Sequence, residues 1–335
     1  MYHKSIDYDK CTSCMACERI CANSRVIREN DQGKPEFLFD FKCIFCGHCL
    51  AICPEKAITF EPVTLDGQTD HAYQAGSLPV DSSTPAADER AVRELLNATR
   101  STRYFLDRAV EPGAIQKILD TMVRAQSAGN EQNRNFYILN DKDRLMALEE
   151  QLRTHFQKLL AIYQNPLAVS GMAMSLAMKT KRSSTNRLQH TGEQAQGNAS
   201  PSIRALYQAN KKVLQDVAMS GDTQITYLHH APVVMIITTG PRSTQMHKGF
   251  YKGDAGIAAT YGTLMARGLG LSACWLGLLE IAVNKNEKIK RSLGIGEHER
   301  IDAALALGYS DLIWHQIPPR GPVKVVWNGM QEGQA

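Results

Sequence analysis

Two identical cysteine runs constrain this chain more than any other feature of its sequence. Eight of the nine cysteines follow the spacing C-x2-C-x2-C-x3-C twice, and the second run repeats the first 32 residues later. The runs comprise Cys11, Cys14, Cys17 and Cys21, then Cys43, Cys46, Cys49 and Cys53. This spacing is typical of [4Fe–4S] clusters, because one tight turn presents three thiolates and the fourth cysteine of each run ligates the other cluster.

The spacing therefore predicts two clusters with crossed ligand sets. One cluster takes Cys11, Cys14, Cys17 and Cys53, and the other takes Cys43, Cys46, Cys49 and Cys21. Pro54 follows the second run as the motif expects, whereas Ala22 replaces proline after the first run. Structural zinc is a poorer explanation, because a zinc site takes four ligands in two separated pairs. A disulfide framework would imply a secreted chain, and residues 1–4 offer no apolar signal segment.

Length and composition leave room for a small module and one larger domain. The chain has 335 residues, of which 43% are hydrophobic and 21% charged, as in ordinary soluble proteins. The net charge of +4 comes from scattered lysines and arginines, which speaks against a nucleic-acid partner. The apolar stretch 167–178 is too short for a membrane span. Cysteines kept as thiolate ligands indicate a reducing compartment, so we expect a cytoplasmic protein.

Composition along the chain predicts three parts. Residues 1–60 form a small ferredoxin-like 2[4Fe–4S] domain, and 61–88, rich in Gly, Ser, Pro, Thr and Asp, form a linker. Residues 89–335 form an α+β domain with a buried sheet, interrupted by an irregular insertion or lid at about 162–228. Apolar periodicity predicts helices near 88–98, 112–123, 142–161, 203–217 and 254–268, and strands near 57–60, 136–139, 232–237, 303–307 and 323–327.

Four segments of the larger domain carry groups suited to a phosphorylated, planar ligand. They are 99–105, 126–132, 253–271 and 273–277. Arginine forks match phosphate oxygens, and amide side chains hydrogen-bond to heterocycles. Taken singly, the first segment also fits a solvated basic turn, and the second fits a glycine-containing end of a helix.

Together and in this order, the segments resemble the nitroreductase family of FMN-dependent oxidoreductases. The matching motifs are Arg100-Ser101-x-Arg103-x-Phe105, Ser127-Ala128-Gly129-Asn130-x-Gln132, Ala231-Pro232-Val233-Val234, Asp254-x-Gly256, Gly268-Leu269-Gly270 and Ala306-Leu307-Gly308-Tyr309. The resemblance covers about residues 90–328. With the N-terminal cysteine repeat, the chain is similar to the ferredoxin-fused subgroup, which implies a nitroreductase-like FMN-binding fold.

The resemblance also implies which residues bind the flavin. Arg100, Ser101 and Arg103 would hold the FMN phosphate and ribityl chain, and Arg320 would close on the phosphate. Ser127, Asn130 and Gln132 would lie along the isoalloxazine or ribityl group, and the backbone of Trp275, Leu276 and Gly277 would approach the ring. No catalytic side chain is required, because flavin N5 carries the chemistry. Thr99, Gln126 and Asn133 depart from the family pattern, so we expect an unusual substrate wall.

The implied function is an oxidoreductase supplied with electrons by its own clusters. An external low-potential donor such as ferredoxin would reduce the two [4Fe–4S] clusters, and FMN would reduce a small organic acceptor. Nitroaromatics, quinones and activated double bonds are the leading acceptors, and a homodimer is expected. Two alternatives remain open: a specialised reductive flavoenzyme for dehalogenation or biosynthesis, and an electron-transfer component in which FMN is only a relay.

Overall fold

The structure, a computed structural model, describes most of both predicted domains. It covers residues 2–21, 26–38, 43–62, 87–164, 226–240, 249–318, 321–322 and 325–326. The predicted helix at 203–217, most of the predicted strand at 323–327, most of the linker and most of the insertion lie outside these residues. Within the described ranges, no helix combines the length and the apolar character that a membrane crossing requires.

The N-terminal module is small and is built around its cysteines. Strands β1 (Tyr2–Ile6) and β4 (Ile58–Pro62) pair antiparallel, and so do β2 (Ile27–Glu29) and β3 (Pro35–Phe37). Helices α1 (Ala16–Ile20) and α2 (His48–Ile52) each begin within a cysteine run. The buried apolar cluster of the described module contains only Cys17, Val26, Ile27, Cys49 and Ile58. Such a core is too small to stabilise a fold well by itself, so the module depends on what its cysteines bind.

The larger domain is an α+β fold around a four-stranded antiparallel sheet. Its strands are β5 (Asn135–Leu139), β6 (Val233–Thr239), β7 (Ser272–Trp275) and β8 (Arg300–Gly308). They lie in the order β5-β6-β8-β7. This arrangement confirms the predicted fold class.

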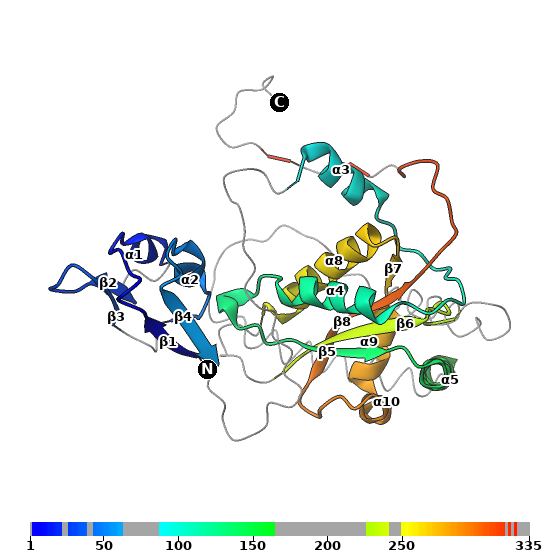
Figure 1. Ribbon diagram of the computed structural model, residues 1–335. Helices are drawn as coiled ribbons and strands as arrows, with labels where there is room; N and C mark the ends of the chain where they lie inside the picture. The colour runs from blue at the N-terminus through cyan, green and yellow to red at the C-terminus, as the bar shows by residue number, and fades with distance from the viewer. Residues whose placement is uncertain are drawn as a thin grey trace.

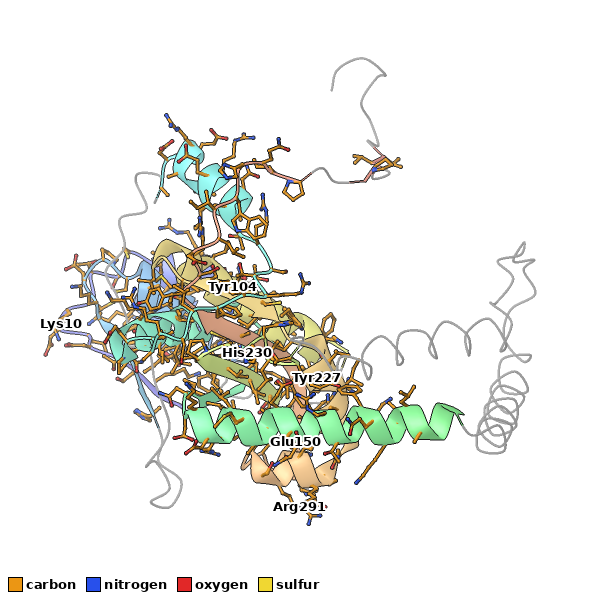
Figure 2. All side chains as sticks on the ribbon, turned by 90° about the vertical axis from the view of Figure 1, so that its right-hand side faces the viewer. Lys10, Tyr104, Glu150, Tyr227, His230 and Arg291 are labelled. Carbon is orange, nitrogen blue, oxygen red and sulfur yellow. The ribbon has the colours of Figure 1, made fainter. Side chains whose placement is uncertain are left out.

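Helices cover both faces of this sheet (Figure 1). Helices α4 (Pro112–Val123) and α8 (Tyr251–Gly268) pack on one face, with Val233, Met235 and Ile237 of β6. The long helix α5 (Lys142–Gln164), α9 (Gly277–Lys285) and α10 (Glu287–Ser292) pack on the other face, with Val234 and Ile236. Figure 2 shows α5, which carries Glu150, beside α10, which carries Arg291. Because both faces are buried, β6 is a continuous apolar run rather than an alternating one.

Local signals explain why several predicted helices begin where they do. Asp88 accepts a hydrogen bond from the Arg90 N–H and caps α3 (Glu89–Ala98), and Pro112 is the first residue of α4. Helices α9 and α10 were not predicted, although Asn286 caps α10 by accepting from two backbone N–H groups. No residue of α3 is buried.

Alanine at Gly308 is expected to destabilise the larger domain. A Cβ there would lie 2.6 Å from Pro232 Cδ and 3.0 Å from a ring carbon of Phe105, so β8 or its neighbours must shift. We expect a loss of about 1–3 kcal/mol, as for other overpacked sites. Gly253→Ala is the control, because a Cβ there meets nothing within 4 Å. Calorimetric unfolding of the two variants measures the difference, and equal melting temperatures would contradict the close packing around Gly308.

Candidate functional site

Four cysteines from two distant parts of the chain surround one cavity in the module. Cys11, Cys14 and Cys17 line it together with Cys53, the last cysteine of the second run. The backbone also contacts one of these sulfurs, because the Ala57 N–H donates to Cys53 Sγ at 3.3 Å. The structure thus brings together the four residues predicted to bind the first cluster.

The other four cysteines also lie close together. Burial raises the pKa of the Cys49 thiol to about 11, and the charges of neighbouring Cys43, Cys46 and Cys21 add to this shift. Cys21 therefore lies within electrostatic reach of the second run, as the crossed assignment requires. Binding to iron offsets the cost of ionising such a buried thiol, because a metal deprotonates its thiol ligand.

The thiol arrangement fits clusters better than the alternatives. All nine cysteines are free, so no disulfide framework is present. Among the described residues, no three Cys, His, Asp or Glu side chains are placed to hold a single metal ion. One zinc ion would draw its thiolates together at Zn–S distances of about 2.3 Å. The paired repeat of eight cysteines, with one cavity lined by Cys11, Cys14, Cys17 and Cys53, suits iron–sulfur clusters.

The arginine motif of the larger domain lies beside β7. The Thr102 N–H donates to the Ala273 carbonyl at 3.0 Å, and Ser101 forms a bridge with Ala273. Alternate residues of an extended segment face opposite sides. Thr102 is accordingly buried, whereas Ser101 and Arg103 are exposed.

The two arginines of this motif point to different surroundings. Arg100 lines a hollow with Thr263 and Arg267 of α8, and its buried Nε has no hydrogen-bond partner among the described residues. Burial lowers the pKa of His229 and raises that of Cys274, and the charge of Arg103 lowers both, so Arg103 lies near these two residues. The unpartnered Nε of Arg100 could donate to a phosphate oxygen, and so could the exposed guanidinium of Arg103 together with the Ser101 hydroxyl. The residues present therefore fit FMN, although the side chains of Arg100 and Arg103 lie in different surroundings.

The second flavin motif forms a braced turn at the other end of α8. The turn includes the short helix η2 (Ala128–Asn130), and Asp254 accepts hydrogen bonds from the Ala128 N–H at 3.1 and 3.2 Å. Ser127 Oγ accepts from the Gln132 N–H at 2.9 Å. Sequence reasoning missed Arg134, whose buried guanidinium donates to the carbonyls of Ala125, Gln126 and Asp254. Burial lowers its pKa and nearby Asp254 opposes that shift.

Helix α8 separates the two flavin motifs within one copy of the chain. Arg267, beside Arg100, follows Asp254, beside the turn, by 13 positions. At 1.5 Å per residue, this places the two contacts about 20 Å apart along the helix axis. The ring of Trp275 lies against Gly256, where an added Cβ would be 3.9 Å away. Positions 254 and 256 are about 200° apart around a helix, so Trp275 and the turn lie on opposite sides of α8.

The backbone predicted to approach the flavin ring lies at the junction of β7 and α9. The Leu276 N–H donates to the Ala304 carbonyl at 2.8 Å, so it is used within the sheet. Gly277 is exposed and begins α9, whose first N–H groups have no partner within the helix. Gly277 is therefore better placed than Leu276 to donate to a ligand. Arg320 and residues 165–225 of the predicted lid lie outside the described residues.

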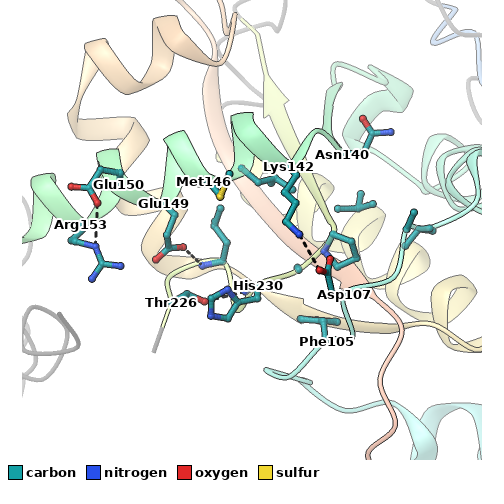
Figure 3. Close-up of a pocket in the computed structure, with 17 residues that line it drawn as sticks. Phe105, Asp107, Asn140, Lys142, Met146, Glu149, Glu150, Arg153, Thr226 and His230 are labelled. Atoms are coloured by element: carbon teal, nitrogen blue, oxygen red, sulfur yellow. Dashed lines mark hydrogen bonds and ion pairs between the residues drawn. The ribbon is translucent and has the colours of Figure 1, made fainter. Parts of the chain in front are cut away.

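A separate hollow of about 670 Å³ lies between α5 and the start of β6 (Figure 3). Lys142 pairs with Asp107 at its edge, and Glu149 accepts from the N–H groups of Tyr227 and Leu228. No residue predicted to bind a cluster or FMN lines it. Glu149 therefore positions the chain that leads into β6 and has no assigned chemical role.

Family models match both parts of the chain. The model of the nitroreductase family matches residues 96–309, and that of a 4Fe-4S dicluster domain matches residues 3–54. The fold and the two sites define an FMN-dependent oxidoreductase with an iron–sulfur electron-transfer module. The chain belongs to the nitroreductase family and carries an N-terminal 4Fe-4S ferredoxin-type domain.

Two curated proteins are similar to a short part of the chain. The chain is 37% identical over 60 residues to the ferredoxin-type protein NapH of Haemophilus influenzae, which is 17% of this chain and 21% of that protein. It is 38% identical over 56 residues to the pyruvate synthase subunit PorD of Thermotoga maritima, which is 17% of this chain and 54% of that protein. The chain thus spans about a fifth and about half of these relatives.

Solved structures similar to the larger domain include two nitroreductases with bound FMN. The one from Bacteroides fragilis is 19% identical with a TM-score of 0.48, and the match covers 72% of this chain and 100% of that one. The one from Desulfitobacterium hafniense is 15% identical with a TM-score of 0.46, and the match covers 70% of this chain and 96% of that one.

Proposed function

We propose that this chain is an iron–sulfur flavoenzyme that takes low-potential electrons from an external donor such as ferredoxin and reduces a small organic acceptor. The observation that carries the proposal is a direct contact between its two parts: Asn130 in the flavin-domain turn donates to two carbonyls of the second cysteine loop. When bound, FMN supplies reduction by hydride or by single electrons. Nitroaromatics, quinones and activated double bonds are the proposed acceptors, and a reducing compartment such as the cytoplasm suits the thiolate ligands.

The module would hold two [4Fe–4S] clusters. Cys11, Cys14, Cys17 and Cys53 would bind one, and Cys43, Cys46, Cys49 and Cys21 would bind the other. The shared cavity of the first set and the electrostatic proximity within the second support this assignment. The eight-cysteine repeat supports two clusters rather than one.

The flavin site would be completed by a second copy of the chain. One copy would offer Ser101, Arg103 and the backbone at Gly277, and its partner would offer the turn with Ser127 and Gln132. The position of α8 between these groups within one copy supports a shared site.

Exposed apolar surface gives independent support for a homodimer. The apolar residues Val92 and Leu96 of α3 are 43% and 53% exposed, and Ile313 and Ile317 near the end of the described chain are 78% and 62% exposed. Surfaces of this kind mark contacts with other proteins. A second copy would cover them.

An anaerobic absorption spectrum with iron and flavin analysis tests the proposal first. We expect a broad iron–sulfur band together with flavin peaks. The purified enzyme, reduced photochemically, is then mixed with a nitroaromatic, a quinone, an enoate and a haloaromatic. Oxidation by one of the first three supports the proposed acceptors, whereas oxidation only by the haloaromatic favours dehalogenation. Electron transfer to a protein partner without turnover of any small molecule would identify a relay.

Alanine at Arg100 or Arg103 is expected to weaken FMN binding without loss of iron. A charge-assisted hydrogen bond contributes about 1.5–3 kcal/mol, so we expect roughly 10- to 100-fold weaker binding. Quenching of flavin fluorescence in a titration of the flavin-free protein measures it. Arg291→Ala, at an exposed position of α10, is the control. Loss of iron together with FMN would contradict two separate cofactor sites.

A further inference from the structure

The two cysteine loops have the same backbone conformation. Ser13 and Phe45, at matching positions of the repeat, have φ angles of 56° and 50°. Two residues later, Met15 and Gly47 have φ angles of 56° and 73°. Left-handed residues at the same two places indicate that both loops follow one path, so any difference between them lies in their outward contacts.

Among the described residues, only the second loop accepts hydrogen bonds from the flavin domain. The Phe45 ring faces into the module, where it meets Phe60 edge-on at 6.4 Å and lies 5.2 Å from Lys4 Nζ. Asn130 Nδ2 donates to the carbonyls of Ile44 and Phe45 at 3.1 and 2.8 Å. Within the same described ranges, no residue of the flavin domain donates to the matching carbonyls of the first loop, at positions 12 and 13. Figure 1 shows the module beside the segment that joins α4 to β5.

The turn that presents Asn130 is well suited to hold another part of the protein in place. Gly129 and Asn130 have φ angles of 57° and 53°, and asparagine tolerates this left-handed region better than most residues. Asp254 fixes one end of the turn through Ala128. Arg134 holds the preceding chain to the start of α8. The amide of Asn130 therefore projects from a fixed support.

We propose that Asn130 is a positioning residue that docks the loop between Cys43 and Cys46 on the flavin domain. The second cysteine run is then the side from which electrons leave the module, and the first run faces the external donor. The assignment of electron flow rests on the proposed function. Parts of a chain joined by few contacts move relative to one another by default, and electron tunnelling falls steeply with distance. Holding the loop therefore sets the rate of transfer.

Two substitutions test this role in the holoenzyme. Asn130→Asp keeps the size and the left-handed tolerance but turns a carboxylate toward two carbonyl oxygens. Asn130→Gly keeps the backbone conformation and removes the side chain. Thr12→Ala is the matched control, because Thr12 is exposed and corresponds to Ile44 in the repeat.

Amide hydrogen exchange and transfer kinetics provide separate readouts. We expect both Asn130 variants to show faster exchange at residues 43–47. We also expect flavin reduction by the methyl viologen radical to slow about tenfold, as loss of two neutral hydrogen bonds would give. Iron content should stay at the wild-type level, and Thr12→Ala should change neither readout.

Each other outcome is decisive. Unchanged exchange in both variants would overturn the docking role, and loss of FMN without a change in exchange would assign Asn130 to the flavin instead. Faster exchange with an unchanged rate would overturn the second run as the electron exit. If the wild-type clusters transfer no electrons to flavin, the proposed function fails, whereas the exchange measurement still decides whether Asn130 docks the loop.

Discussion

Alanine at Cys21 is expected to remove the cluster of the second cysteine run, while the first run keeps its own. Cys21 is the last cysteine of the first run, but its charge acts on Cys49 of the second. Cys53 likewise lines the cavity of Cys11, Cys14 and Cys17. Loss of the fourth cysteine of either run should therefore remove the cluster held by the other run.

The largest effect of Cys21→Ala should be on the rate of turnover driven by the external electron donor. Loss of a group that hydrogen-bonds to a metal ligand costs a metal site roughly 10- to 100-fold in affinity or activity. Loss of a ligand itself should therefore cost at least as much in donor-driven turnover. Iron content should fall to about half of the wild-type value if each cluster holds half of the iron. Flavin content should not change, because Cys21 lies in the module.

Iron analysis of paired variants distinguishes crossed from uncrossed ligands. Adding Cys46→Ala to Cys21→Ala should remove no further iron, because both residues belong to one cluster. Adding Cys14→Ala should remove nearly all of the remainder. Uncrossed ligand sets predict the reverse. Cys274→Ala is the control, since this ninth cysteine is buried beside β8 in the larger domain.

Features that depend on residues close in sequence were predictable. The cysteine spacing predicted that Cys11, Cys14 and Cys17 lie together in one tight turn, and these three residues line one cavity. Their role as cluster ligands stays a prediction. The apolar run of β6 and the periodic apolar residues of α4 appear as a buried strand and a buried helix. Helices α9 and α10 were missed because Gly277–Lys285 mixes β-branched and helix-forming residues, and α10 has only six residues.

Features that depend on distant residues were not predictable. The sequence placed Arg100 and Arg103 in one motif, but pairing of Ser101 with Ala273 gives the motif an extended backbone that turns them to different surroundings. The position of α8 between Trp275 and the 127–132 turn is likewise a tertiary feature. The contact of Asn130 with the cysteine loop spans more than 80 residues of sequence, and no local signal announces it. The roles of these residues in binding FMN stay predictions.

Mixed dimers are expected to recover activity that neither parent variant has, if the flavin site spans two copies. One parent carries Arg103→Ala on the phosphate side. The other carries Gln132→Gly, in which glycine removes the side chain without straining the left-handed backbone, where φ is 49°. Each mixed dimer would contain one site with both changes and one with neither. Random reassociation makes about half of the dimers mixed, so about a quarter of the wild-type sites should return.

A control with both substitutions on one chain gives the opposite expectation and so distinguishes a shared site from a site within one copy. In the control, the double variant Arg103→Ala, Gln132→Gly is mixed with wild type. If the site is shared, each of the two sites in a mixed dimer then carries one of the two changes. Only wild-type homodimers then contribute, and activity should be about a quarter of that of wild type alone. A site confined to one copy would instead retain about half here and would recover nothing in the first mixture. Because α8 lies between the two motifs within one copy, we expect the shared-site result in both mixtures.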